Sequence, residues 1–220
     1  MDSKLLDALF TTLLLSVIPF LAALPCSLVF ARLMVKKVPL VSQLLGCFVF
    51  IFRGSPLLLQ LFFFYYGASQ FDFIRKHETL WPIFSSALTI AYLTLFLNSC
   101  AYVTEVFRSA LLTTPKTETE AAKSFSLKNS EVWKYIEWPH LLKLCPKSVI
   151  NEGISLLKGS SLVSTITVFE LTSWARNGVA ETFDPYYYFG VISAIYFLMV
   201  YLYQKILNSL FSLKKQNFSN

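Results

Sequence analysis

Charged residues are scarce in this chain of 220 residues. Asp, Glu, Lys and Arg together make up 15% of it, whereas about 25% is usual in a soluble domain. Hydrophobic residues make up 55%, with 21 Phe and 11 Tyr among the aromatics. A soluble fold could not bury so much apolar surface, and large exposed apolar patches aggregate. The composition therefore excludes an ordinary soluble domain and favours a protein that uses the lipid bilayer as its solvent.

The sequence also lacks the residue patterns of common enzymes and metal proteins. It contains two His and four Cys, no two of the cysteines are in C-x-x-C spacing, and the motifs H-E-x-x-H, G-x-S-x-G and G-x-x-x-x-G-K-[ST] do not occur. The scattered cysteines argue against a disulfide framework or a zinc site. We therefore expect no catalytic residues, no metal site and no cofactor bound by this chain, and no ATP bound through a P-loop of its own.

The net charge of +6 could suggest a nucleic-acid partner, but the basic residues lie between apolar runs. They do not interleave with exposed aromatics as in a single-strand binding groove, so we expect no nucleic acid. Their distribution instead predicts orientation in a membrane. With the N-terminus outside and the C-terminus cytoplasmic, 13 of the 19 Lys and Arg lie in cytoplasmic segments and 4 in outer ones, as the positive-inside rule favours.

The apolar runs predict an all-α integral membrane protein of about five spans. A helix needs about 20 residues to cross the hydrocarbon core. We expect one transmembrane domain, 1–220, with a core of about 5–209, and a helix over 40–52 that leads into the second span on the cytoplasmic side. The expected spans are about 9–31, 55–71, 80–104, 148–171 and 186–207.

The longest polar stretch, about 117–140, lies between the third and fourth expected spans. Thr117 and Glu120 have the spacing of a capping box at a helix start. The residues 126–129 favour a turn, and a second helical run is expected to end at Trp138 and Pro139. A helix, turn and helix of this kind suits a docking projection, although an ordinary amphipathic loop has the same periodicity.

The sequence of this stretch resembles a known docking element. It matches the EAA loop of ABC importer permeases at Glu120, Ala121, Ala122 and Pro139, and Ser126 occupies the position at which that family has Gly. Three further segments resemble the polar amino acid branch of these permeases, the histidine, glutamine and arginine type: FRGSPLL at 52–58, NSCAYVTEVFR at 98–108 and NEGISLLKGSSLVS at 151–164. Four matches in the family order are specific, and the similarity covers most of residues 9–207.

The resemblance implies the transmembrane domain of a type I ABC importer in the bacterial inner membrane. It implies that the loop docks on a cytoplasmic ABC ATPase dimer, which binds ATP and Mg on its own chains. It further implies a second permease chain, identical or similar to this one, an extracytoplasmic solute-binding protein, and a polar amino acid as substrate. Which amino acid is carried, and whether the pair is a homodimer or a heterodimer, stay open.

Three positions depart from the family pattern, and one of them is Trp138, which stands where Leu is usual before the Pro. If the Gly of the loop has positive φ, Ser126 there costs about 1 kcal/mol or more. Gly159 stands where relatives carry Asp, and the loss of that acid leaves a preference for cationic side chains open. Gly159 could equally serve a close contact between helices.

Polar side chains within apolar spans are functional candidates by default. An amino acid zwitterion needs a cation for its carboxylate and acceptors for its ammonium group. Arg53 or Lys158 could bind the carboxylate, and Asn98, Glu152 and Ser155 could accept from the ammonium group. The alternatives are pairing within one helix, anchoring at the interface, or contacts that hold the helices together.

Two other classes of function compete with a transporter. A membrane-embedded enzyme would need acid-base groups at membrane depth, and neither His lies within an expected span. A passive channel or a scaffold would need no cytoplasmic docking loop. The projection at about 117–140 is therefore the feature that discriminates between these classes.

Overall fold

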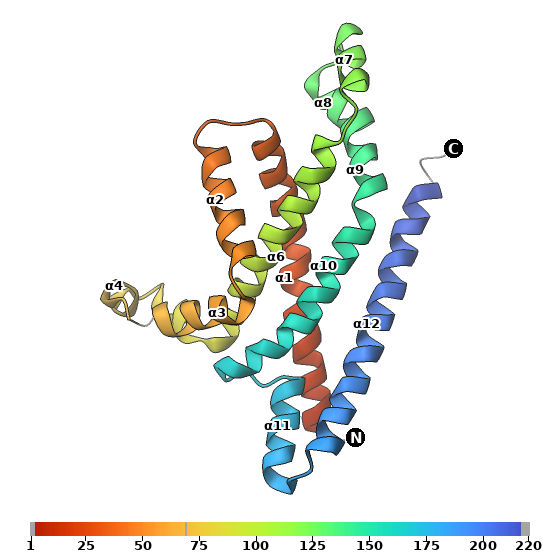
Figure 1. Ribbon diagram of the computed structural model, residues 1–220. Helices are drawn as coiled ribbons and strands as arrows, with labels where there is room; N and C mark the ends of the chain where they lie inside the picture. The colour runs from red at the N-terminus through yellow and green to blue at the C-terminus, as the bar shows by residue number, and fades with distance from the viewer. Residues whose placement is uncertain (1–2, 69, 217–220) are drawn as a thin grey trace.

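The computed structural model describes residues 3–68 and 70–216, with side chains described up to residue 209. That part of the chain is helical throughout its regular structure and contains no β-strand (Figure 1), which confirms the expected all-α class. Three helices are long and apolar enough to cross a membrane: α1 (Ser3–Val35), α6 (Ala87–Leu112) and α12 (Pro185–Gln216). Two further candidate spans are bent helix pairs, so the described residues offer between three and five spans.

The first bent pair covers the expected lead-in helix at 40–52 and part of the expected second span at 55–71. Helix α2 (Val41–Gly54) ends before Ser55, and α3 (Leu57–Phe62) with the π-helical turn η1 (Phe63–Gly67) leaves at 109° to it. Pro56 supplies no backbone N–H, and Ser55 is extended, so one continuous helix cannot pass this point. The expected lead-in helix is thus α2, which packs against α1 and α6, while α3 runs across them (Figure 1). We call the break at residues 55 and 56 the elbow.

The second bent pair corrects the expected fourth span at 148–171. Helix α10 (Pro146–Gly159) continues as the 3₁₀ segment η3 (Ser160–Ile166), and Thr167 then adopts a left-handed φ of 70°. Helix α11 (Leu171–Thr182) begins afresh at an angle of 50°. Buried Glu170 caps its start, because its Oε1 accepts from Ser173 N at 3.0 Å.

The remaining expected boundaries differ by a few residues from the observed helix ends. Helix α1 extends beyond 9–31 at both ends, and α12 contains the whole of 186–207. Within the expected 80–104, the short helix α5 (Trp81–Ser85) ends before Ser86, whose side chain accepts from Thr89 N at 3.3 Å and caps α6. Helix α4 (Asp72–Lys76) lies between η1 and α5.

Helix α1 forms the centre of the bundle. Its small or apolar residues Ala8, Leu15, Ala23 and Ala31 have no exposed surface and recur about every two turns, so one stripe of α1 is buried. Its main partner is α6, and Ser27 Oγ donates to Cys100 O of α6 at 3.0 Å. Small residues permit such close helix packing inside a membrane.

Helix α12 covers α10 and α11 through tyrosines seated on glycines. A Cβ atom on Gly153 would lie 2.8 Å from Tyr203 Cζ, and one on Gly178 would meet the ring of Tyr188. The absent side chains therefore permit the close approach of α12. Most of the rest of α12 is exposed, as expected for a helix that faces lipid or a partner.

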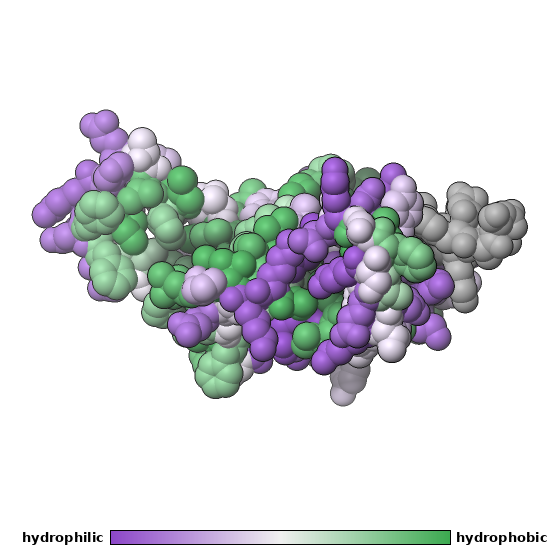
Figure 2. Space-filling view, turned by 90° about the horizontal axis from the view of Figure 1, so that it is seen from above, coloured by the Kyte–Doolittle hydropathy of each residue, from purple (hydrophilic) through white to green (hydrophobic). Residues whose placement is uncertain are grey.

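The polar stretch after α6 projects from one end of the bundle. It contains α7 (Lys116–Ser124), α8 (Asn129–Val132), the π-helical turn η2 (Trp133–Glu137) and α9 (Trp138–Leu144). We call residues 113–144 the projection. Figure 1 places α7 and α8 at its tip, at the end of the molecule opposite the start of α1. Seen from that end, hydrophilic residues gather over the middle of the face (Figure 2).

Candidate functional site

Two cavities lie between the elbow, α6 and α10. One has a volume of about 400 Å³ and the other about 300 Å³. Tyr102 of α6 and Glu152 of α10 line both of them, so the two cavities lie next to each other, and we call them together the route. Four of the five expected substrate residues line this route: Arg53, Asn98, Glu152 and Ser155. Lys158 is exposed and is not among the residues that line either cavity.

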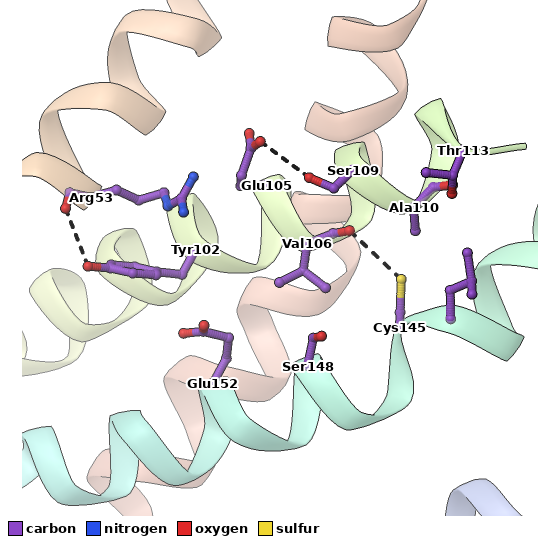
Figure 3. A pocket seen from close by; sticks show the side chains of 11 residues that line it. Arg53, Tyr102, Glu105, Val106, Ser109, Ala110, Thr113, Cys145, Ser148 and Glu152 are labelled. Carbon is purple, nitrogen blue, oxygen red and sulfur yellow. Dashed lines mark hydrogen bonds between the residues drawn. The ribbon is translucent and has the colours of Figure 1, made fainter.

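Opposite charges without a fixed partner border the larger cavity. Figure 3 shows Arg53 from α2 and Tyr102 from α6 on one side, and Glu152 from α10 on the other. The Arg53 guanidinium lies 5.5 Å from the centre of the Tyr102 ring, and Tyr102 Oη donates to Arg53 O at 3.4 Å. Within the described residues, neither Arg53 nor Glu152 forms a salt bridge. Both charges are therefore available to a charged ligand.

The other carboxylate of the larger cavity is already compensated. Arg108 Nη2 donates to Glu105 Oε1 at 2.6 Å, and Arg108 Nε donates to Glu105 Oε2 at 2.8 Å. This bidentate pair, three residues apart on α6, has the short distances of a strong charge-assisted contact. Glu152 is thus the carboxylate of the route that lacks a cation of its own.

Gln60 connects the elbow to Asn98. The Gln60 side chain is 6% exposed, and its Nε2 donates to Phe52 O at 2.8 Å and to Ser55 O at 2.9 Å. Its Oε1 accepts from Asn98 Nδ2 at 3.0 Å. The sequence analysis did not select Gln60, although a polar residue in the uncharged run after Arg53 is the signal that could have found it.

Ser99 is a second residue of the site that the sequence analysis missed. It is 4% exposed and lines the smaller cavity, and its Oγ has no hydrogen-bond partner within the described residues. A buried hydroxyl without a partner costs free energy unless water or a ligand satisfies it. Ser99 was not expected because it lies about 100° around the helix from Asn98 and so does not share the polar face that contains Asn98.

Gly159 lies close to the start of α3. A Cβ atom at this position would lie 2.8 Å from a Leu57 methyl group, so a larger residue would require this flexible side chain to shift.

The projection differs from its expected outline at both ends. Helix α7 begins at Lys116 after Pro115, so Thr117 lies inside the helix and does not cap it. The capping contact instead occurs at the second helix, where Glu131 Oε2 accepts from Lys128 N at 2.7 Å. Pro139 does not end the helical run, because the π-helical turn η2 leads directly into α9 through the helical residues Glu137 and Trp138.

The EAA residues lie at the tip of the projection. Glu120 and Ala121 are exposed, whereas Ala122 is buried. Ser126 closes the turn after α7 with a φ of 60°, the left-handed conformation for which the family uses Gly. Pro139 is half-buried where the projection meets the bundle.

The base of the projection is attached to two long helices. Arg32 in the last turn of α1 lies over the Trp133 ring of η2, with its guanidinium carbon 3.8 Å from the ring centre. His140 Nε2 lies 3.3 Å from Thr113 Oγ1, just after α6. Burial raises the pKa of the Cys145 thiol, at the end of α9, to about 12, so this group stays neutral.

Comparison with known proteins identifies relatives over most of the chain. The chain is 32% identical over 203 residues to the nopaline transport system permease protein NocM of Agrobacterium fabrum, which covers 92% of this chain and 84% of NocM. It is 35% identical over 155 residues to the histidine/lysine/arginine/ornithine transport system permease protein HisM of Escherichia coli K12. That alignment covers 70% of this chain and 65% of HisM.

Two solved structures share the fold. An amino acid ABC transporter crystallised with histidines superposes with a TM-score of 0.82 and 26% identity, over 95% of this chain and 93% of its own. The inward-facing MetNI methionine ABC transporter superposes with a TM-score of 0.75 at 14% identity, over 97% and 99% of the two chains. The family model of the binding-protein-dependent transport system inner membrane component matches residues 9–212. The chain therefore belongs to this family of membrane-embedded permeases.

Proposed function

We propose that this chain is the membrane-spanning subunit of an importer for polar amino acids, driven by ATP hydrolysis on separate subunits. The observation that carries the proposal is the route past Tyr102, where the unpaired charges of Arg53 and Glu152 face a cavity between candidate spans. The names of the relatives support the substrate class, since they describe transport of nopaline and of histidine, lysine, arginine and ornithine.

The chemistry of the route suits a zwitterion. The Arg53 guanidinium offers several N–H donors in one plane, which matches a carboxylate. Glu152 and the carbonyl oxygen of Asn98 are acceptors for an ammonium group, and Ser99 and Ser155 supply hydroxyls beside them. Lys158 stays a prediction, because a rearrangement of α10 would be needed to bring it into the same cavity.

The projection is the proposed ATPase-docking element. Exposed Glu120 and Ala121 would enter a groove of the partner ATPase, which would carry the ATP and Mg. The attachment of the projection to α1 and α6 would then transmit closure of an ATPase pair into rigid-body movement of the bundle. We propose a second permease chain, two ATPase copies and an external solute-binding protein, with the N-terminus outside and the C-terminus cytoplasmic.

A charge reversal at the tip of the projection tests this proposal. We expect Glu120→Arg to abolish co-purification of the ATPase and ATP-driven uptake of labelled amino acids in proteoliposomes. Glu118→Arg is the matched control, because Glu118 is exposed on the opposite side of α7 and should keep both activities. An unchanged set of partners in Glu120→Arg would contradict docking and favour a channel or a scaffold.

A further inference from the structure

Gln60 satisfies backbone groups that the elbow leaves without partners. The last carbonyls of a helix have no intrahelical donor, and Pro56 cannot supply one after α2. Gln60 Nε2 donates to Phe52 O in the last turn of α2, and to both the carbonyl and the Oγ of Ser55, the latter at 2.9 Å. Ser55 Oγ in turn donates to Ile51 O at 2.7 Å. One buried amide thus closes the break between α2 and α3.

These contacts dictate which way the Gln60 amide faces. Backbone carbonyl oxygens only accept hydrogen bonds, so the NH₂ group of Gln60 must point to the elbow and its Oε1 must point away. The Oε1 accepts from Asn98 Nδ2 on α6 at 3.0 Å. An amide oxygen cannot donate, so Asn98 must turn its own NH₂ group to Gln60. Asn98 Oδ1 then remains as an acceptor to which no described group donates, beside the second N–H of Asn98 Nδ2.

The orientation matters because Asn98 lines the smaller cavity and Gln60 does not. An Asn side chain can present either donors or an acceptor, and the two choices favour ligands of opposite hydrogen-bond character. Here the acceptor stands in the same cavity as the Glu152 carboxylate. Both acceptors suit a ligand that carries an amine or ammonium group.

We propose that Gln60 is a positioning residue, which holds the carbonyl oxygen of Asn98 toward the route by bonding the elbow with its NH₂ group. The elbow carbonyls, Gln60 and Asn98 form a relay of fixed hydrogen-bond direction. The relay favours substrates whose amine carries N–H donors over those whose nitrogen carries none. This proposal rests on the proposed function, because it assumes that the route carries an amino acid.

The test uses the complete transporter in proteoliposomes, with initial rates of uptake of a labelled amino acid. Gln60→Met keeps the length of the side chain and removes the amide. We expect KM to rise about tenfold, as for the loss of one oriented hydrogen bond, with Vmax within about twofold of wild type. We also expect weaker discrimination between the amino acid and its Nα-trimethyl derivative as a competitor, because the trimethylated nitrogen keeps its charge but has no N–H to donate. Gln43→Met, at an exposed Gln of α2, is the control and should change neither.

A double-mutant cycle separates the relay from a general packing role. If Gln60 acts through Asn98, then Gln60→Met combined with Asn98→Ala raises KM no more than Asn98→Ala alone. If the effects of the two substitutions on KM are additive, or if KM in Gln60→Met is unchanged while the wild-type assembly takes up the amino acid, the relay is overturned and the proposed function stands. No uptake of any amino acid by the wild-type assembly would overturn the proposed function and the relay with it. Should Gln60→Met fail to assemble, Gln60→Leu replaces it in the same assays, since it also removes the amide and leaves the cavity residues unchanged.

Discussion

Ser126 shows how one residue can carry a backbone conformation that its side chain disfavours. Its φ of 60° closes the turn between α7 and α8, and Ser126 N donates to Lys123 O at 2.9 Å. A residue with a Cβ atom pays about 1–2 kcal/mol for this left-handed conformation, whereas glycine adopts it freely. The resemblance to the EAA loop suggested this cost, and the backbone of the chain has the conformation that causes it.

We therefore expect Ser126→Gly to stabilise the chain by about 1 kcal/mol, which corresponds to a rise in Tm of about 2–4 °C for a domain of this size. The measurement is thermal unfolding of the purified protein in detergent. Thr119→Gly, in the middle of helix α7, is the control and should lower the Tm, because glycine destabilises a helix interior. A lower Tm for Ser126→Gly would show that the Ser side chain contributes more than the strain costs.

At the scale of helices, the contact between α1 and η2 joins the membrane bundle to the projection. The Arg32 guanidinium stacks on Trp133, and the Trp133 ring centre lies 5.8 Å from that of Trp138 at the start of α9. A stacked guanidinium contributes about 0.5–1 kcal/mol or more to such a contact. Lysine would keep only the cation–π attraction, because an ammonium group has no plane to stack on the ring.

We expect Arg32→Lys to retain the co-purifying ATPase but to lower amino acid uptake per ATP hydrolysed by about two- to fivefold, since the projection would move less rigidly with α1. Uptake and phosphate release in the same proteoliposomes measure this ratio. Lys36→Ala, at an exposed position just after α1, is the control. An unchanged ratio in Arg32→Lys would mean that the contact carries no part of the coupling.

The helical elements themselves were predictable where apolar length decided them. The regions of α1, α6 and α12 follow from long uncharged runs. The break between the expected helix at 40–52 and the expected span from 55 lies where α2 ends and α3 begins, but the angle of 109° between them depends on packing that hydropathy does not describe. The helix in the region of the fourth expected span stops at Ile166, and Glu170 caps a new helix, α11.

For the whole molecule, the arrangement of the ends supports a simple topology. Figure 1 places the start of α1 and helix α11 at one end, and the projection with the end of α12 at the other. The excess of Lys and Arg near the projection favours that end as cytoplasmic. If the projection instead faced the outside, a cytoplasmic ATPase could not reach it.

We expect a membrane-impermeant maleimide to leave Asn129→Cys unlabelled in intact cells and to label it after permeabilisation. The same reagent should label Glu181→Cys in intact cells. Both positions are exposed, at opposite ends of the molecule. The background carries Cys47→Ser, because Cys47 is exposed, whereas buried Cys145 with its pKa of about 12 stays unreactive at neutral pH. Labelling of Asn129→Cys in intact cells would refute the orientation and the docking proposal together.

The amino-acid sequence by itself determined that this chain lies in a membrane, that it is helical, and that one polar segment projects between apolar ones. These properties depend on local composition and spacing, which each segment carries within itself. Only the tertiary structure decided which polar groups meet. Gln60 reaches Asn98 because the chain turns at the elbow, and the unpaired charges of Arg53 and Glu152 share a cavity because α2, α6 and α10 pack together. Hydrogen bonds between distant residues have direction and depend on helix placement, which no single segment encodes.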